Sequence, residues 1–254
     1  MTGLVLAIDQ GTHATRAMIF RDSGRCLAEA SIPVGIHRSD GRVEQDPREL
    51  VESVRAAALQ AIKAAPGGEI DAAGLATQRS TIVCWDAATA EPLTPAISWQ
   101  DTRGKAHVRE LVDSGLASRV RAITGLLPSA HYGASKLRWC LEHVAAVRDA
   151  AASGTLCFGP LASYLVAALT GGCGLADPAN AGRTLLFDFR AGDWSAEMLE
   201  FFGIDRAWLP QCVPSRADFG LMSLGDRRVP LRVCTGDQSA VPFANGRPEP
   251  GAGF

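Results

Sequence analysis

The sequence lacks any long uncharged apolar stretch. No window approaches the roughly 18 consecutive apolar residues that a membrane-spanning helix needs, although 47% of the 254 residues are apolar. The sequence also lacks a block of five or six like charges, and its net charge is −2. Bulk electrostatics therefore indicates neither a nucleic-acid nor a membrane partner. The apolar content suffices for a packed core in one large or two small domains.

Paired cysteine motifs are also missing. None of the seven cysteines forms a C-x-x-C pair, and several lie in apolar runs: Cys26, Cys84, Cys140, Cys157, Cys173, Cys212 and Cys234. This pattern indicates reduced, mostly buried thiols. The amino-terminal "MTGLVLAIDQG" lacks the basic region, long apolar segment and cleavage site of a signal peptide. We therefore expect a cytoplasmic protein.

Several well-known site motifs are absent. There is no G-x-x-x-x-G-K-[ST] phosphate loop, no G-x-S-x-G elbow, no dinucleotide fingerprint and no His/Cys/Asp cluster with zinc spacing. These absences argue against a Walker-type ATPase, a serine hydrolase, a dehydrogenase and a zinc enzyme.

The patterns that are present predict an α/β fold. A meander of three strands is expected at 4–8, 14–20 and 26–34, followed by a helix over 46–65 with Asp46 as its N-cap and Glu49 completing a capping box. Further strands are expected at 70–78, 80–86, 94–101 and 229–236, and helices at 103–115, 134–146, 160–170 and 195–204. Strands first in a meander and then alternating with helices predict a mixed sheet flanked by helices.

The first turn of the meander carries the most unusual pattern. Asp9-Gln10-Gly11-Thr12 ends one strand, and the chain returns at once as another strand. Such a turn can present backbone N–H groups to a phosphate, with Thr12 and Thr15 as hydroxyl donors, Arg16 as a cation and Asp9 as a magnesium ligand. Considered alone, the stretch fits an ordinary hairpin with a polar tip equally well.

The whole chain resembles the FGGY family of carbohydrate kinases, in particular its glycerol kinase branch. The resemblance lies in an ordered series of motifs: "AIDQGTHATRAMIF", "GRVEQDPREL", "GLATQRSTIVCWD", "AISWQDTRG", "SKLRW", "DPANAGRTLLFD" and "CTGDQSA". It implies an actin-like ATPase (ribonuclease H-like) domain that uses ATP and Mg2+ to phosphorylate a polyol or sugar hydroxyl. It would place the nucleotide phosphates against Asp9, Gly11, Thr12, His13, Ala14 and Arg16, with Asp9 holding Mg2+, directly or through water.

The resemblance also implies an acceptor site. Asp237 matches the catalytic base, while the substrate would contact Gln78, Arg79, Ser80, Trp99, His131, Asp237 and Gln238. Read alone, Asp237 could instead be a turn or N-cap residue, Arg79 a surface arginine and Trp99 a core tryptophan. Ser80 replaces the acid that glycerol kinases have here, and a one-residue shift would put Tyr132 in place of His131. The resemblance therefore does not identify glycerol as the acceptor.

Family members have two actin-like domains. We expect residues 1–240 to form the amino-terminal, substrate-binding domain and residues 241–254 to begin the connection to a second domain, supplied in cis or in trans. The face toward that domain should expose apolar side chains. The alternative is a non-catalytic sugar-binding or interaction module from the same family. A ribonuclease H-type nuclease fits poorly because clustered acids and a basic surface are missing. The sequence leaves a homodimer open.

Overall fold

The larger of two main sheets confirms the α/β class with a mixed sheet. The computed structural model describes residues 3–171, 174–244 and 246. Six strands lie in the order β14-β15-β6-β1-β2-β3: β1 (Leu4–Gln10), β2 (Ala14–Arg21), β3 (Cys26–Pro33), β6 (Ile70–Thr77), β14 (Leu221–Leu224) and β15 (Arg227–Gly236). The first three form the expected antiparallel meander, whereas β6 runs parallel to both β1 and β15.

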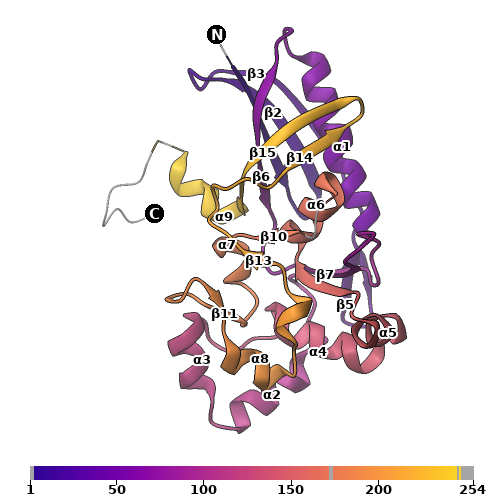
Figure 1. Ribbon diagram of the computed structural model, residues 1–254, viewed down its shortest axis with the longest axis vertical. Helices are drawn as coiled ribbons and strands as arrows, with labels where there is room; N and C mark the ends of the chain where they lie inside the picture. Colours follow the sequence, from indigo (N-terminus) through magenta and orange to yellow (C-terminus); the bar gives the residue numbers. More distant parts are fainter. Residues whose placement is uncertain (1–2, 172–173, 245, 247–254) are drawn as a thin grey trace.

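One face of this sheet is covered and the other is open. Alternate residues of β1 and β2, such as Leu6 and Ile19, are buried in a core shared with α1 (Pro47–Ala64) and α6 (Leu161–Thr170). The intervening residues point to the opposite face. There Val5 is 40% exposed and Val233 is 38% exposed. Figure 1 shows α1 along one side of the upper sheet, with α9 on another side.

Helix α1 begins as expected but not with the predicted capping box. Asp46 is the N-cap and accepts a hydrogen bond from the Arg48 N–H, with Pro47 in the first turn. Glu49 does not reach back to Asp46, because its Oε1 accepts a 3.0 Å hydrogen bond from the Gly35 N–H. The side chain thus links the helix to the preceding loop, and the capping-box prediction is wrong.

The helices and strands that enclose a second core lie mostly in the lower part of Figure 1. It is built around a five-stranded sheet in the order β4-β5-β8-β7-β9: β4 (His37–Ser39), β5 (Arg42–Gln45), β7 (Ile82–Asp86), β8 (Ala96–Ile97) and β9 (Leu156–Pro160). Two short pairs are β10 (Leu175–Ala176) with β13 (Gln211–Cys212), and β11 (Phe187–Asp188) with β12 (Asp193–Trp194). The strand expected at 94–101 is therefore only two residues long.

The helices of the lower part differ from the expectation in number and bounds. They are α2 (Lys105–Asp113), α3 (Ala117–Thr124), α4 (Gly133–His143), α5 (Ala145–Ser153), α7 (Pro178–Ala181) and α8 (Ala196–Phe202), followed near the end of the chain by α9 (Asp237–Ala240). Short 3-10 turns occupy Arg206–Trp208 and Val241–Phe243. The expected helix over 134–146 stops at His143, because extended Val144 both ends α4 and begins α5.

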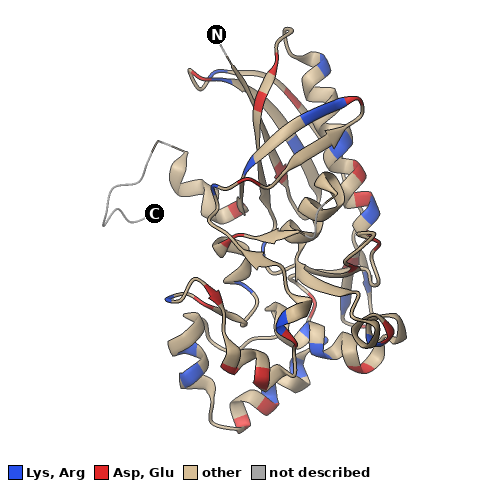
Figure 2. Cartoon of the chain, viewed as in Figure 1, with Lys and Arg blue, Asp and Glu red and all other residues tan. Residues whose placement is uncertain are grey.

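The burial of several cysteines and the mixture of charges on the surface agree with the expectations from the sequence. Cys84, Cys140 and Cys234 are free and buried, while Cys26 is exposed and Cys173 lies outside the described residues. Figure 2 shows basic and acidic residues interspersed over both parts of the molecule. Among the described residues, none of the helices has the length and apolar content to cross a membrane.

Candidate active site

Three parallel strands bring the predicted site residues to one edge of the larger sheet. In register, Gln10 of β1 lies beside Thr77 of β6, which lies beside Gly236 of β15. The residues that follow these strands therefore leave the sheet at the same edge. Ligands of open α/β sheets bind in the crevice outside such carboxyl ends. Gly11, Gln78 and Asp237, far apart in sequence, are thereby brought to one edge.

The turn after β1 has the geometry of an anion cradle. The Gly11 N–H donates to the Ala14 carbonyl at 3.0 Å, which closes a tight turn with Thr12 and His13 at its tip. Within the described part of the chain, the N–H groups of Thr12 and His13 donate no hydrogen bond. Adjacent free N–H groups of this kind bind phosphate oxygens.

Asp9 and Arg16 lie next to each other on the open face, behind this turn. They are directly opposed in the β1–β2 register. Burial raises the pKa of Asp9, the nearby Asp237 raises it further, and Arg16 lowers it. Two neighbouring carboxylates are a fitting place for Mg2+, which uses one or two carboxylates together with nucleotide phosphates and water. The described residues contain no group of three or more acidic, His or Cys side chains that could hold a metal without such help.

Thr15 does not belong to this phosphate turn. Its side chain is fully buried on the α1 face of the sheet, where its Oγ1 lies 2.6 Å from Ser53 Oγ. The expectation that Thr15 donates to a phosphate is wrong, because strand alternation turns it away from Asp9 and Arg16.

Arg79 and Asp237 face each other across the edge of the sheet. Arg79 Nε lies 3.7 Å from Asp237 Oδ1, and the guanidinium also donates to Gln238 Oε1 and to Ser239 Oγ. The Arg79 side chain is only 20% exposed, so it is not a surface arginine. Asp237 is the first residue of α9, with Gly236 as N-cap, and its Oδ1 accepts from the Gln238 N–H. Its Oδ2 accepts no hydrogen bond within the described residues, which leaves it available to a ligand.

A small pocket of about 150 Å³ lies beside this pair. Its lining residues are Thr12, Gln78, Arg79, Trp99, His131, Arg183, Asp237 and Gln238. Pockets for drug-sized ligands are larger, roughly 300–1,000 Å³, so this pocket suits a small molecule. A larger cavity of about 440 Å³, lined by Arg48, Glu91 and Tyr164 among others, lies between α1, α6 and the loop after β7. The smaller pocket is the site candidate because the three strand ends converge on it.

Gln78, Thr12 and Trp99 form one wall of the pocket through a hydrogen-bond network. Trp99 Nε1 donates to Thr12 Oγ1 at 3.0 Å, and Thr12 Oγ1 lies 3.4 Å from Gln78 Oε1. Gln78 is 2% exposed, and its amide N–H groups donate to Gln10 and Gln45. Gln78 therefore helps to fix the turn after β1 and has no free N–H for a ligand. Trp99 is 37% exposed and is not a core residue.

His131, rather than Tyr132, lines the pocket. Its ring packs edge-on against Trp99, with centroids 5.8 Å apart, and its Nε2 lies 3.5 Å from an Arg183 Nη. Tyr132 instead lies under the Arg183 guanidinium, 4.8 Å from its centre. Burial first, and then the charges of Lys136, Arg183 and Arg79, lower the pKa of His131 to about 4. The ring is therefore neutral at physiological pH.

The lowered pKa of His131 predicts a pH dependence of stability. Between pH 6.5 and 4 the unfolded chain binds a proton at this ring and the folded chain does not, so the free energy of unfolding decreases as pH falls through this window. The decrease will be smaller than about 1.4 kcal/mol per unit of pKa shift, because solvent screens the half-buried ring.

Urea unfolding of the unmodified protein and of His131→Gln at several pH values measures this effect. The stability difference between the two should change from pH 6.5 to pH 4, whereas His37→Gln, at an exposed histidine outside the pocket, should leave the profile as it is. A pH-independent difference for His131→Gln would contradict the assignment.

Ser80 adopts an unusual backbone conformation just after Arg79. Its φ is +66°, in the left-handed region, and its side chain is buried with an Oγ that has no partner within the described residues. A non-glycine residue in this region is strained by roughly 1–3 kcal/mol and is held there by its surroundings. Ser80 is not part of the pocket lining; its carbonyl, rather than its side chain, is bound by the protein.

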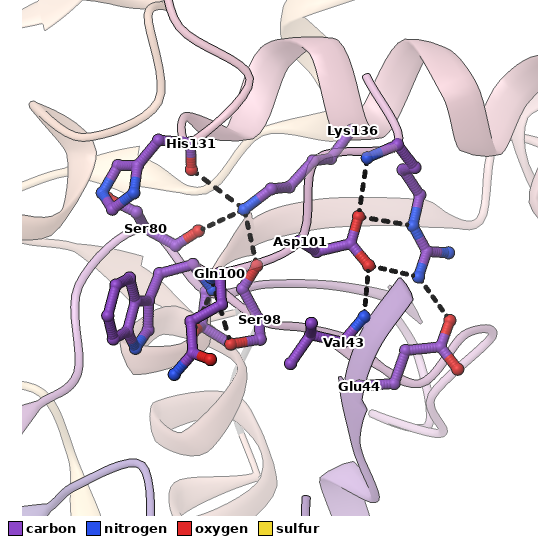
Figure 3. Close-up of polar contacts among 11 residues, drawn as sticks. Val43, Glu44, Ser80, Ser98, Gln100, Asp101, His131 and Lys136 are labelled. Carbon is purple, nitrogen blue, oxygen red and sulfur yellow. Dashed lines mark hydrogen bonds and ion pairs between the residues drawn. The ribbon is translucent and has the colours of Figure 1, made fainter. Parts of the chain in front are cut away.

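A buried lysine binds this carbonyl together with two others (Figure 3). Lys136 Nζ, from α4, donates to the carbonyls of Ser80 at 3.1 Å, Ser98 at 2.8 Å and His131 at 2.9 Å. Each carbonyl belongs to a different loop of the pocket. Nearby Asp101 accepts from the Val43 N–H and from Arg103, and thereby ties the same region to β5. Lys136 thus connects the Arg79, Trp99 and His131 loops.

Two residues of the site were not identified from the sequence. Lys136 lies in the motif "SKLRW" and Arg183 in "DPANAGRTLLFD", but the sequence patterns predict no role for either residue. The motif with Arg183 is anchored to the sheet, because Thr77 Oγ1 donates to Asn180 Oδ1 and Asn180 Nδ2 donates to buried Asp177. The motifs themselves were the available signal, since a charged residue inside an apolar motif requires a partner when it is buried.

Comparison with known proteins gives a consistent result. Residues 4–244 match the model of the FGGY family of carbohydrate kinases, N-terminal domain. Glycerol kinases of Acidovorax ebreus (strain TPSY) and Thermus brockianus are 38% and 41% identical over 94% and 93% of this chain, and the match covers 49% of each relative. The chain therefore spans about half the length of the curated relatives it matches.

Solved structures show the same fold. A glycerol kinase from Plasmodium falciparum with ADP matches with a TM-score of 0.89 and 26% identity, over 95% of this chain and 50% of that one. A ligand-bound xylulose kinase from Lactobacillus acidophilus matches with a TM-score of 0.85 over 95% of this chain and 49% of that one, at 20% identity.

Proposed function

Because the chain belongs to the FGGY family of carbohydrate kinases, we propose that it is the acceptor-binding half of an ATP-dependent, glycerol kinase-like enzyme that phosphorylates a polyol or sugar hydroxyl. The observation that carries this proposal is the convergence of Asp9, Arg79 and Asp237 at the ends of three parallel strands. This arrangement supports a site in which the turn at Thr12 holds phosphates and Asp237 offers a free carboxylate oxygen beside one small pocket, with Asp9 close enough to Asp237 to help hold Mg2+.

Each residue has a role in such a transfer. The acceptor lies beside Trp99 and His131, which both line the pocket, with Arg79 and Gln238 donating to its hydroxyls. Asp237 Oδ2 takes the proton of the reacting hydroxyl, as the carboxylate bases of kinases do. When bound, MgATP would supply the γ-phosphoryl group; the N–H groups of Thr12 and His13 would hold its phosphates, and Asp9 would help to hold its Mg2+. Holding the acceptor in place is a large part of catalysis, since misplacement by about 1 Å can cost roughly 100-fold.

The remaining half of the machinery would dock on the open face of the larger sheet. This face exposes Val5 and Val233, and the turn after α9 exposes Val241 and Phe243 at 62% and 61%. Exposed apolar side chains of this kind mark interaction surfaces. Of the expected connection over residues 241–254, residue 245 and residues 247–254 lie outside the described part of the chain.

The test is to supply the missing half. The chain would be fused to, or mixed with, the carboxyl-terminal half of the Thermus brockianus glycerol kinase and assayed for ATP-dependent phosphorylation of glycerol, erythritol, ribitol, xylulose and gluconate. The amino-terminal half of the same relative is the positive control. Phosphorylation of one acceptor supports the proposal. No phosphorylation by this chain, when the control half is active, would contradict it.

A second candidate function is a polyol-binding module without catalysis. It is favoured by one observation: hydrogen bonds within this chain already hold Gln78, Arg79 and Trp99 at the pocket, so an acceptor could bind without the second half. Saturable binding of a polyol in the absence of any phosphorylation, with the control half active, would support this alternative.

We expect the absence of a side chain at Gly236 to be necessary for the positions of Arg79 and of the proposed base, Asp237. A Cβ at Gly236 would overlap Cγ and Cδ of Arg79, so Gly236→Ala must displace Arg79 or Asp237. We expect kcat/KM in the complemented assay to fall by about 100-fold. Gly67→Ala is the matched control, because its added Cβ would meet no atom within 4 Å. Unchanged kinetics in Gly236→Ala would show that Arg79 does not act at this edge.

A further inference from the structure

The pocket contains more positive than negative charge. Among its lining residues Arg79, Arg183 and Asp237 are charged. Asp237 lies beside Arg79, whereas Arg183 forms no ion pair with any carboxylate in the described part of the chain. Asp9, the other nearby acid, lies on the phosphate side and faces Arg16. One guanidinium of the pocket is therefore left without a counter-charge.

Arg183 is held in place but retains free hydrogen-bond donors. Its guanidinium lies 4.8 Å from the ring centre of Tyr132, and one Nη makes a 3.5 Å contact with His131 Nε2. The other Nη has no hydrogen bond within the described residues and is not enclosed. Since α7 is anchored to the end of β6, the backbone that carries Arg183 is fixed as well. A preoriented guanidinium with free donors is suited to a planar anion.

The surroundings of His131 show the same excess of positive charge. After burial, the charges that lower its pKa are those of Lys136, Arg183 and Arg79, of which the two guanidinium groups line the pocket. Arg79 has its own pKa lowered by burial and then by Arg183. Like charges repel, and an anion bound near the guanidinium groups of Arg79 and Arg183 would reduce this repulsion. The His131–Arg183 part of the pocket therefore carries a positive charge that no carboxylate of the described residues pairs with, whereas Asp237 lies beside Arg79.

We propose that the acceptor is a polyol chain bearing a carboxylate, which Arg183 binds at one end of the pocket while the reacting hydroxyl lies at the Asp237 end. This inference rests on the proposed function and names its substrate class: a polyhydroxy acid rather than a neutral polyol. The carboxylate matches the flat guanidinium with two N–H···O bonds. The pocket of about 150 Å³ favours a short chain.

Matched acid and alcohol pairs test the proposal on the unmodified chain. Isothermal titration at pH 7.5 and constant ionic strength would compare glycerate with glycerol, erythronate with erythritol, and gluconate with glucitol. We expect the acid of at least one pair to bind at least tenfold more tightly than its alcohol. Equal or tighter binding of the alcohol in every pair would overturn the inference while leaving the proposed function intact. No binding by any compound would overturn the inference that this chain holds a preformed acid site, and the complementation assay would then decide the proposed function separately.

Variants identify the residue responsible. Arg183→Gln removes the charge, and the ratio of the two dissociation constants within the selective pair should fall at least tenfold. Arg183→Lys should retain part of it, and Arg190→Gln, an exposed arginine that lies over Phe189 outside the pocket, is the matched control. Selectivity that survives in folded Arg183→Gln would overturn the assignment. A further outcome would also overturn the assignment. If glycerol 3-phosphate binds more tightly than glycerate and this preference is lost in Arg183→Gln, Arg183 binds the phosphoryl group of the product and not a carboxylate of the acceptor.

Discussion

Asp237→Asn will lower the rate of phosphoryl transfer in the complemented enzyme by about 10²- to 10⁴-fold. Asparagine has nearly the shape of aspartate and can still accept a hydrogen bond from the Gln238 N–H. It cannot take a proton from the acceptor hydroxyl. Arg79 also loses the carboxylate that lies 3.7 Å from its Nε. The loss should therefore appear mainly in kcat, with a smaller change in KM.

The measurement compares steady-state kinetics of the two proteins with the same carboxyl-terminal partner. Asp226→Asn is the matched control, because this exposed acid lies in the turn between β14 and β15, at the other end of the strand that leads to Asp237. The control should retain full activity. Equal rates for Asp237→Asn and the unmodified protein would show that another group accepts the proton.

Lys136→Met will destabilise the protein by roughly 2–4 kcal/mol. Methionine fills most of the space, but it leaves the buried carbonyls of Ser80 and His131 without their lysine donor. The Ser98 carbonyl keeps the Asp101 N–H as a partner. Because the three loops lose their common tie, we also expect acceptor binding to weaken by more than tenfold. Unchanged binding in a folded Lys136→Met protein would show that Lys136 only supports the fold.

The pH dependence gives a second readout for Lys136. Burial lowers its pKa to about 7, with attraction to Asp101 opposing this effect and Arg103 adding to it. Between pH 7 and about 10.5 the unfolded chain holds this proton and the folded chain does not, so the free energy of unfolding should increase with pH, by at most about 1.4 kcal/mol per unit.

Urea unfolding across this range should show the slope in the unmodified protein and its loss in Lys136→Met. Lys63→Met, at an exposed lysine of α1, is the control and should keep the slope. A slope that remains in Lys136→Met would assign it to another group.

Much of the fold could be predicted because its signals are local. The alternation of apolar residues in β1 and β2 and the turn residues between them specify a hairpin in any context. Asp46 and Pro47 likewise mark the start of α1. The missed elements lack such signals. Helix α3 has no side chain that caps its first turn, and β9, although fully buried, is only five residues long. Their conformation depends on packing against residues far away in the chain.

The sequence by itself determined the family, through ordered motifs, and the chemistry available at each strand end. Only the tertiary structure decided which of these groups meet. The parallel pairing of β6 with both β1 and β15 sets Arg79 opposite Asp237, and the bonds of Lys136 bring the loops of Ser80, Ser98 and His131 together. Whether Arg183 has a counter-charge, and whether the amide of Gln78 is free, depends on distances between segments that are remote in sequence. Those distances arise from packing, which no local pattern specifies.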